Sequence, residues 1–174
     1  MEFKKSKKNK NIIYGKINTE LFKHVNWYLT VPLDSDEFHH QNLMLDVDEI
    51  VCIEEDLNCP YTFCLLFFLE DEEITPKIKL IFSTFGYLVT IKYILQKVYD
   101  FYFEIIQKEE YSLLIDHFRH TDKYQNIYQR EISSCKAVNR IKFFSSDINN
   151  IKFTDLQLEN KMYNTYCVKI SVKK

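Results

Sequence analysis

Glycine is nearly missing from this chain: Gly15 and Gly86 are the two glycines among 174 residues. A dinucleotide-binding turn needs several closely spaced glycines, and the loops that cradle phosphates are also rich in glycine. The chain also lacks the Gly-x-Ser-x-Gly motif of serine hydrolases and the His-Glu-x-x-His motif of zinc proteases. These absences disfavour most cofactor-dependent enzymes, so we expect no cofactor, no small-molecule substrate and no enzymatic activity.

Signals of secretion are missing as well. The five cysteines are odd in number and none forms a Cys-x-x-Cys pair, and no Asn-x-Ser/Thr acceptor site occurs. No apolar core follows the lysine-rich N-terminus, and no run approaches the length of about 18 apolar residues that spans a membrane. We therefore expect a reducing, cytoplasmic setting without membrane contact.

Positive charge is missing from the middle of the chain. Between His24 and Pro76 there is no lysine or arginine, and that stretch holds thirteen Asp and Glu. Residues 1–23 carry seven lysines against two glutamates, and residues 77–174 carry sixteen basic against ten acidic residues. The net charge is only −2, so the charges are segregated rather than in excess. Basic ends around an acidic middle indicate a protein that binds a polyanion.

Length and hydrophobicity predict one folded domain. The chain has 46% hydrophobic residues, including 14 Phe and 12 Tyr, which can bury large areas in a core. The first residues are rich in lysine and have no apolar periodicity, which is typical of a segment that does not fold alone. We assign residues 1–12 to a basic extended tail and residues 13–174 to a single α+β domain.

Three segments have helical spacing: Asn18–Val31, Tyr87–Lys108 and Ser112–Glu131. In the first, Leu21, Val25 and Leu29 recur every four residues before Pro32 disfavours continuation. The second is apolar on most faces, which predicts a long buried helix. Between the first two, Leu33–Asp48 is an acidic connection in which we expect one helical turn.

Six segments are predicted to be strands: Glu49–Glu54, Thr62–Leu69, Lys77–Phe82, Arg140–Phe144, Ile151–Leu158 and Tyr163–Val172. The continuous apolar run of Thr62–Leu69 suits a central strand. Turns at Glu70–Glu73 and Glu159–Lys161 predict hairpins. Because strands are grouped rather than alternating with helices, we expect an α+β fold. Its mostly antiparallel sheet would be packed by the long buried helix and the second helix.

The basic residues predict an RNA-binding surface. The tail has five lysines in seven positions, and the predicted second helix brings Arg119, Lys123 and Arg130 to one face. Nearby aromatic residues could stack on unpaired bases while the cations neutralise phosphates. An ordinary solvated helix face, or internal pairing with the acidic stretch, is the alternative. The candidate RNA-binding residues are Lys4, Lys5, Lys7, Lys8, Lys10, Arg119, Lys123, Arg130 and Arg140.

Metal chemistry has weaker support. The pairs Glu54-Glu55 and Glu72-Glu73 are adjacent in sequence, so on a strand each pair would split between opposite faces. Glu70 and Glu72 alternate correctly but fall in a predicted turn. His117 and His120, and the cysteines at 52, 59 and 64, lack the spacing of a zinc site. We expect no metal and no catalytic residue.

These patterns favour a non-enzymatic binding protein of an RNA-rich particle. The most concrete form is a ribosome-bound inhibitory or hibernation factor, with its basic tail on rRNA and its acidic stretch facing ribosomal proteins or solvent. The alternative is a protein-interaction module, such as a viral or parasite factor acting on another protein through its acidic, aromatic surface. A metal-dependent phosphohydrolase is the third hypothesis.

Overall fold

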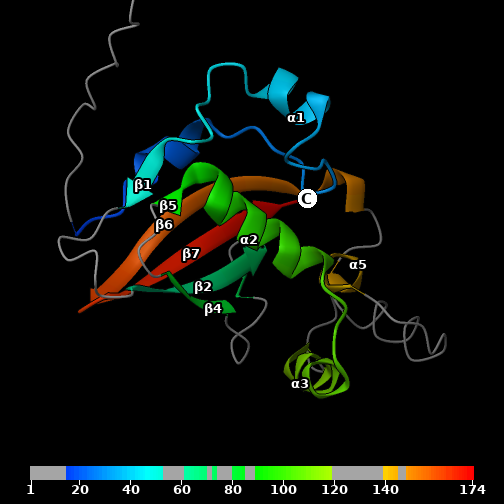
Figure 1. The fold of residues 1–174 in the computed structure, drawn as a ribbon. Helices are drawn as coiled ribbons and strands as arrows, with labels where there is room; N and C mark the ends of the chain where they lie inside the picture. The colour runs from blue at the N-terminus through cyan, green and yellow to red at the C-terminus, as the bar shows by residue number, and fades with distance from the viewer. Residues whose placement is uncertain are drawn as a thin grey trace, which may run out of the picture.

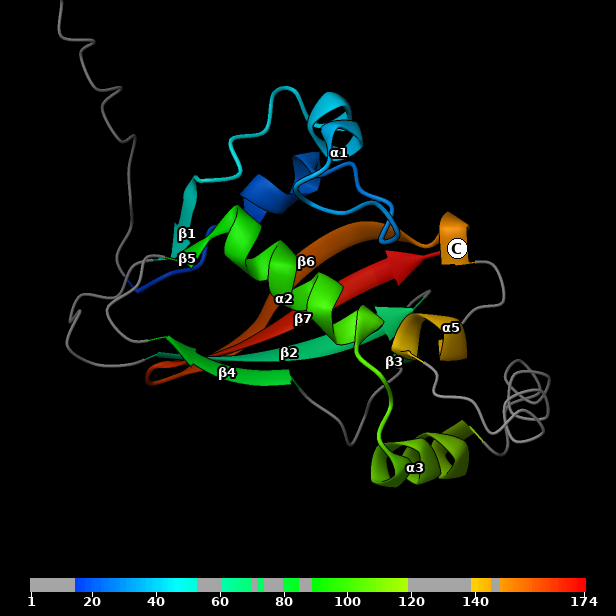
Figure 2. The ribbon, with the colours of Figure 1, turned by 45° about the vertical axis from the view of Figure 1, so that its right-hand side comes forward.

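A twisted mixed sheet carries the fold (Figures 1 and 2). Helices α1 (Asp36–Gln41) and α2 (Ile91–Phe103) and the N-terminal segments lie on one of its faces, whereas α3 (Lys108–Phe118) and α5 (Arg140–Phe144) lie toward one end of the sheet, with α3 below its level. The computed structural model describes residues 15–52, 61–69, 72–73, 80–84, 89–118, 139–144 and 148–174. The sheet order is β3-β2-β7-β6, and β4 also pairs with β2. The strands are β2 (Tyr61–Leu69), β3 (Glu72–Glu73), β4 (Leu80–Thr84), β6 (Lys152–Met162) and β7 (Thr165–Lys173).

The central contact of the sheet is the parallel pairing of β2 with β7, which joins residues far apart in the chain. In both strands every second side chain is apolar and buried. Burial of one large apolar side chain contributes about 1.5–3 kcal/mol, so this double row is a major part of the core. The paired residues of the row are Phe63 and Tyr166, Leu65 and Val168, Phe67 and Ile170, and Leu69 and Val172.

Helix α2 (Ile91–Phe103) packs on this row of buried side chains. The side chain of Thr90 caps it by accepting a hydrogen bond from the Tyr93 amide at 3.2 Å. The rings of Phe101 and Phe67 stack with centroids 3.6 Å apart. The predicted long buried helix is confirmed, but it is shorter than Tyr87–Lys108. Its start is later because Val89–Thr90 form strand β5, which pairs with β1 (Ile50–Cys52).

The predicted helix Asn18–Val31 is wrong for most of its length. Only Thr19–His24 are helical, as the short 3₁₀ helix η1. From Val25 to Leu33 every second residue is buried, which is the alternation of extended chain. Backbone bonds from the Leu29 amide to Ile151 and from the Phe153 amide to Trp27, both 2.9 Å, hold this segment beside β6. An apolar spacing of four fits both helix and alternation, which explains the error.

The helical turn expected within Leu33–Asp48 is present as α1 (Asp36–Gln41), capped by Ser35. The buried amide of Asn42 fixes its position. The Asn42 side chain donates to the carbonyls of Asn26 at 2.8 Å and Phe38 at 2.9 Å, and accepts from the Asn26 amide at 2.8 Å. Because a buried amide must satisfy its polar atoms, these bonds tie α1 to the N-terminal extended segment.

The segment after α2 forms α3 (Lys108–Phe118), followed among the described residues by α5 (Arg140–Phe144) and η2 (Ile148–Asn150). The prediction of a strand at Arg140–Phe144 is wrong, because this segment is helical. Arg140 and Ile141 are both buried and Lys142 is exposed, which is not an alternating pattern. A five-residue segment is too short for periodicity to separate helix from strand.

The C-terminal hairpin of β6 and β7 is confirmed, but its turn lies at Tyr163–Asn164 rather than at Glu159–Lys161. The expected central strand β2 is also confirmed. The strand predicted at Lys77–Phe82 is present as β4, antiparallel to β2, but it is described from Leu80 to Thr84. Glu72–Glu73, predicted as part of a turn, instead form strand β3 against the end of β2. The fold is α+β as predicted, with one parallel strand pair in an otherwise antiparallel sheet. Across the described ranges, no helix is both long enough and apolar enough to cross a membrane.

We predict that Tyr163→Asn stabilises the protein. Tyr163 is 94% exposed and has φ 51°, a left-handed conformation that asparagine adopts more readily than tyrosine. The expected gain in the free energy of unfolding is about 1 kcal/mol, measured by urea denaturation. Tyr163→Phe, which keeps the ring and the strain, should leave stability unchanged. Equal stability of all three proteins would contradict the backbone explanation.

Candidate nucleic-acid interface

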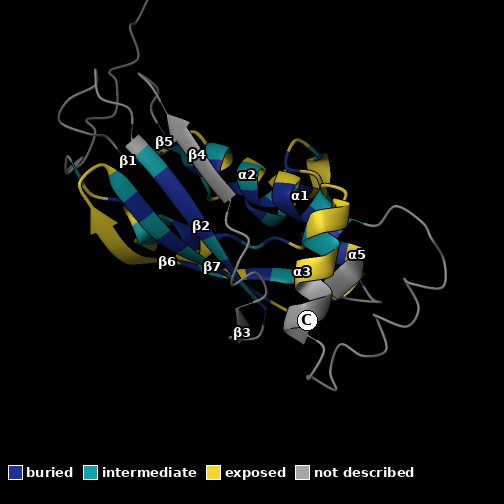
Figure 3. Cartoon of the chain, turned by 90° about the horizontal axis from the view of Figure 1, so that it is seen from below, coloured by how far each residue is buried: buried dark blue, intermediate teal, exposed yellow. Residues whose placement is uncertain are grey.

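Within the described ranges, no helix packs along the face of β2 and β7 that lies opposite α2. Since alternate residues of a strand point to opposite faces, the buried row of β2 and β7 leaves a second row on the other side. In Figure 3, which looks from that side, most of the length of β2, β7 and β6 is seen without a helix in front of it, and α3 lies at the end near the C-terminus. We call this side the open face. Its residues in β2 and β7 are Thr62, Cys64, Leu66, Phe68, Thr165, Cys167, Lys169 and Ser171.

Two lysines on the open face lie against aromatic rings. Lys169 Nζ is 4.4 Å from the centroid of the Phe68 ring. Lys152 Nζ is 5.4 Å from the centroid of the Tyr28 ring, and the two residues are joined by an isolated β-bridge. Lys173 pairs with Lys152 in the sheet register and is exposed. Each lysine over a ring has a favourable electrostatic contact that orients the ammonium group.

Positive charge predominates on this face. Among its residues with described side chains, Asp155 is the one carboxylate beside the three lysines. Asp155 accepts hydrogen bonds from the Gln157 side chain at 2.7 Å and from the Leu156 amide at 2.8 Å. Glu73, in β3, holds the register position opposite Phe68 at the sheet edge. The open face therefore presents cations and rings together, which is the composition of a nucleic-acid surface.

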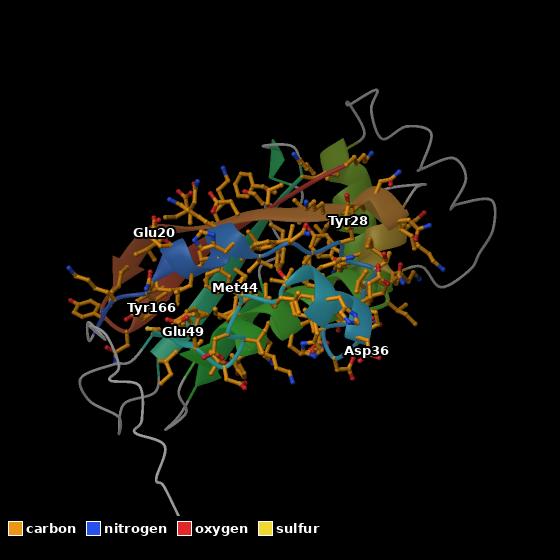
Figure 4. The ribbon with its side chains drawn as sticks, turned by 90° about the horizontal axis from the view of Figure 1, so that it is seen from above. Glu20, Tyr28, Asp36, Met44, Glu49 and Tyr166 are labelled. Carbon is orange, nitrogen blue, oxygen red and sulfur yellow. The ribbon has the colours of Figure 1, made fainter. Side chains whose placement is uncertain are left out.

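Six of the thirteen carboxylates of the acidic middle lie on the opposite side of the molecule. Figure 4, seen from above, places Asp36 and Glu49 there, together with Met44. All the carboxylates from α1 and its flanking segments are exposed. They are Asp34, Asp36, Glu37, Asp46, Asp48 and Glu49. The carboxylates of residues 34–49 are thus separated in space from the lysines of the open face.

The predicted tail residues Lys4, Lys5, Lys7, Lys8 and Lys10 lie outside the described residues. The chain is described from Gly15, which has φ 70° and therefore requires glycine. The Gly15 carbonyl accepts a hydrogen bond from Lys161 Nζ at 2.6 Å, and that ammonium also lies 4.7 Å from the Tyr166 ring centroid. Residue 15 is therefore held near the end of the β6–β7 hairpin, on the side of the sheet that carries Tyr166 and the rest of the buried row.

Of the cations predicted in the second half of the chain, Arg119, Lys123 and Arg130 also lie outside the described residues. Arg140 is described, and the prediction that it contacts phosphates needs correction. Its side chain is only 8% exposed and is held by carboxylates of the chain itself. Both Nε and Nη2 of Arg140 donate to Glu110, the second at 2.7 Å, and Nη1 donates to Glu104 at 2.6 Å.

Arg140 instead joins three helices. Its Nη1 also donates to the Phe101 carbonyl at 2.9 Å, and its guanidinium lies 4.3 Å from the Phe101 ring centroid. Burial alone would lower the pKa of Arg140, but the hydrogen bonds of Glu110 and Glu104 outweigh burial, and the pKa is raised. The arginine therefore stays charged and connects α5 to the end of α2 and the start of α3.

Sequence reasoning missed the open-face residues Tyr28, Phe68, Lys152, Lys169 and Lys173. The alternation of residues in Tyr163–Val172 does place Lys169 on the face opposite the apolar row, so the sequence contained a signal for this lysine. Phe68 belongs to a continuous apolar run, which does not distinguish the two faces of a strand. Tyr28 lay in a segment predicted to be helical. Its role depends on a contact with residue 152 that periodicity cannot reveal.

The structure adds no support for a metal site. Within the described ranges, no group of three or more His, Cys, Asp or Glu residues could hold a metal ion. Glu54, Glu55, Glu70 and His120 lie outside those ranges. Cys52 belongs to the β1–β5 pair and Cys64 to the central sheet.

Comparisons with protein-family models, with curated proteins and with solved structures found no match.

We predict that Arg140→Met destabilises the fold by about 3 kcal/mol, because it leaves Glu110, whose side chain is 11% exposed, without its cation. The matched control is Lys142→Met in the same helix, where the lysine is exposed and the loss should stay within about 0.5 kcal/mol. Urea denaturation of both variants measures the difference. If both variants lose the same free energy of unfolding, the buried ion pairs of Arg140 contribute no stability of their own.

Proposed function

We propose that this protein is a non-enzymatic RNA-binding factor of an RNA-rich particle, most concretely an inhibitory factor that binds the ribosome. The observation that carries the proposal is the open face, where Lys169 lies on the Phe68 ring and Lys152 lies on the Tyr28 ring. An uncovered sheet with rings and cations can bind unpaired nucleotides, because bases stack on the rings and phosphates pair with the lysines.

Single-stranded RNA suits this face better than a duplex. The rings of Phe68 and Tyr28 are both partly exposed, and stacking on them requires bases that are not already paired. Polar side chains of the neighbouring strands, such as Gln157, Asn160 and Ser171, can bond to base edges or to the 2′-hydroxyl. Loops and bulges of rRNA offer such unpaired nucleotides.

The tail supplies a second contact. Its five lysines precede residue 15, which Lys161 holds near the hairpin end of the sheet. Two linked contacts bind more strongly than either alone, because the first raises the effective concentration of the second. The acidic side then faces away from the RNA, toward solvent or toward the basic ribosomal proteins. A protein that occupies a functional site of the ribosome without catalysing a reaction acts as an inhibitor.

We predict that open-face substitutions weaken binding to a single-stranded RNA oligonucleotide. Lys169→Gln should lower the slope of log affinity against log salt by about 0.7, the value for one phosphate contact on a single strand. Phe68→Leu keeps an apolar side chain but removes the stacking ring, and should cost about 1–3 kcal/mol of binding. Fluorescence anisotropy across a salt series measures both effects.

The matched control is Lys92→Gln. Lys92 is an exposed lysine of α2, on the covered side of the sheet, so its substitution should leave affinity and salt slope unchanged. The open face is excluded as the binding surface if the Lys92 variant loses as much affinity as the Lys169 variant. It is also excluded if binding is insensitive to salt.

We predict that the full chain sediments with ribosomes and that deletion of residues 1–12 reduces the bound fraction at moderate salt. Binding of the lysine-rich tail releases counterions from the RNA, and this release favours binding less at higher salt. The tail's contribution to affinity should therefore decrease as the salt concentration rises. Sedimentation through a sucrose cushion with quantitative immunoblotting gives the bound fraction. Binding that survives both nuclease treatment and the deletion would instead favour the protein-interaction hypothesis.

That second hypothesis has one specific observation in its favour. Leu43 and Met44 are 79% and 99% exposed, directly beside the exposed carboxylates Asp46 and Asp48. Adjacent apolar and acidic groups suit a partner protein with an apolar, basic surface. Under this reading, substitution of Leu43 and Met44 by serine abolishes the nuclease-resistant binding, whereas the open-face variants bind normally.

A further inference from the structure

Two cysteines of the open face are direct neighbours. Cys64 in β2 and Cys167 in β7 are partners in the register of the parallel strand pair. Partner residues of adjacent strands project from the same face of the sheet. Both residues carry thiols, as does Cys52, which belongs to the separate β1–β5 pair. The pairing is a product of folding, because Cys64 and Cys167 lie far apart in the sequence.

The spacing of the strands suits a disulfide. Neighbouring strands lie about 4.8 Å apart, and a disulfide joins Cα atoms about 4.4–6.8 Å apart. Its Cβ atoms must approach to about 3.5–4.5 Å, so the two strands have to close slightly at this position. A bond formed under that constraint is more easily reduced than an unstrained structural disulfide.

The two thiols differ in access to solvent. Cys167 is partly exposed on the open face, whereas Cys64 is 7% exposed. An oxidant dissolved in water therefore meets Cys167 first, and Cys64 is placed to resolve the product. Cys52, at 2% exposed, has neither solvent access nor a cysteine as its register partner.

We propose that Cys64 and Cys167 form a reversible disulfide and make the open face an oxidant-sensitive modification site. The oxidant class is a small disulfide such as oxidised glutathione. The Cys167 thiolate attacks one sulfur of glutathione disulfide, which forms a mixed disulfide and releases one glutathione thiolate. The Cys64 thiolate then attacks the Cys167 sulfur and releases the second glutathione. Two thiols are oxidised, one disulfide is reduced, and each thiol loses its proton to solvent.

On the open face, the pair Cys64–Cys167 is flanked by two other register pairs: Thr62 with Thr165 on one side, and Leu66 with Lys169 on the other. The disulfide would therefore cross-link the two central strands beside the lysine that contacts the Phe68 ring. The modification depends on the register of β2 and β7 and not on any property of RNA. Its test consequently succeeds or fails independently of the proposed function.

The experiment uses the purified full chain, incubated in a series of reduced and oxidised glutathione mixtures. Remaining thiols are blocked with N-ethylmaleimide at acid pH, and the protein is digested for mass spectrometry. Trypsin alone is insufficient because residues 24–77 form a single tryptic peptide that contains Cys52, Cys59 and Cys64. Chymotrypsin is therefore added, because Tyr61 and Phe63 separate Cys59 from Cys64.

We expect one intramolecular disulfide that links Cys64 to Cys167, loss of two of the five thiols, and full reversal by excess reduced glutathione. Cys167→Ser should abolish the disulfide, whereas Cys52→Ser should form it normally. The proposal is overturned if Cys167 stops at the mixed disulfide with glutathione, or if Cys64 pairs with Cys59 instead. It is also overturned if the thiols resist oxidation until the chain is unfolded, which circular dichroism on the same samples would reveal.

Discussion

The parallel pairing of β2 with β7 is the contact on which the rest of the structure depends. It joins a strand near residue 65 to the last strand of the chain, and it aligns two apolar rows into one buried surface. Helix α2, the N-terminal extended segment and β6 all pack against that surface or extend it. A parallel pair cannot be closed by a tight turn, so the long connection between the strands must fold around it.

One-sided covering of this sheet explains the arrangement of charge. In β2 and β7 the fully buried row faces α2, and the other row is mixed, with Lys169 beside the half-buried Leu66 and Phe68. The carboxylates of residues 34–49 lie on the covered side, where α1 and its flanking segments meet solvent. They are separated from the open-face lysines because the sheet and its buried row lie between them.

The sequence predicted most strongly those features that depend on local pattern. The continuous apolar run of Thr62–Leu69, the buried helix and the C-terminal hairpin are present because each has a pattern that one secondary structure alone satisfies. Predictions failed where one pattern fits two structures. Leu21, Val25 and Leu29 fit a helix as well as alternation, and only the backbone bonds to β6 select extended chain. Arg140 was assigned to the surface because charged residues usually lie there, yet Glu104 and Glu110 allow its burial.

The sequence by itself determined which residues could form a core, where charge of each sign is concentrated, and which glycine-dependent enzyme motifs are absent. Those properties reside in composition and in short-range periodicity. Tertiary structure decided which face each strand presents, which lysines meet aromatic rings, and that Cys64 lies beside Cys167. Alternation assigns side chains to two faces of a strand, but only contacts between distant segments determine which of the two faces is covered.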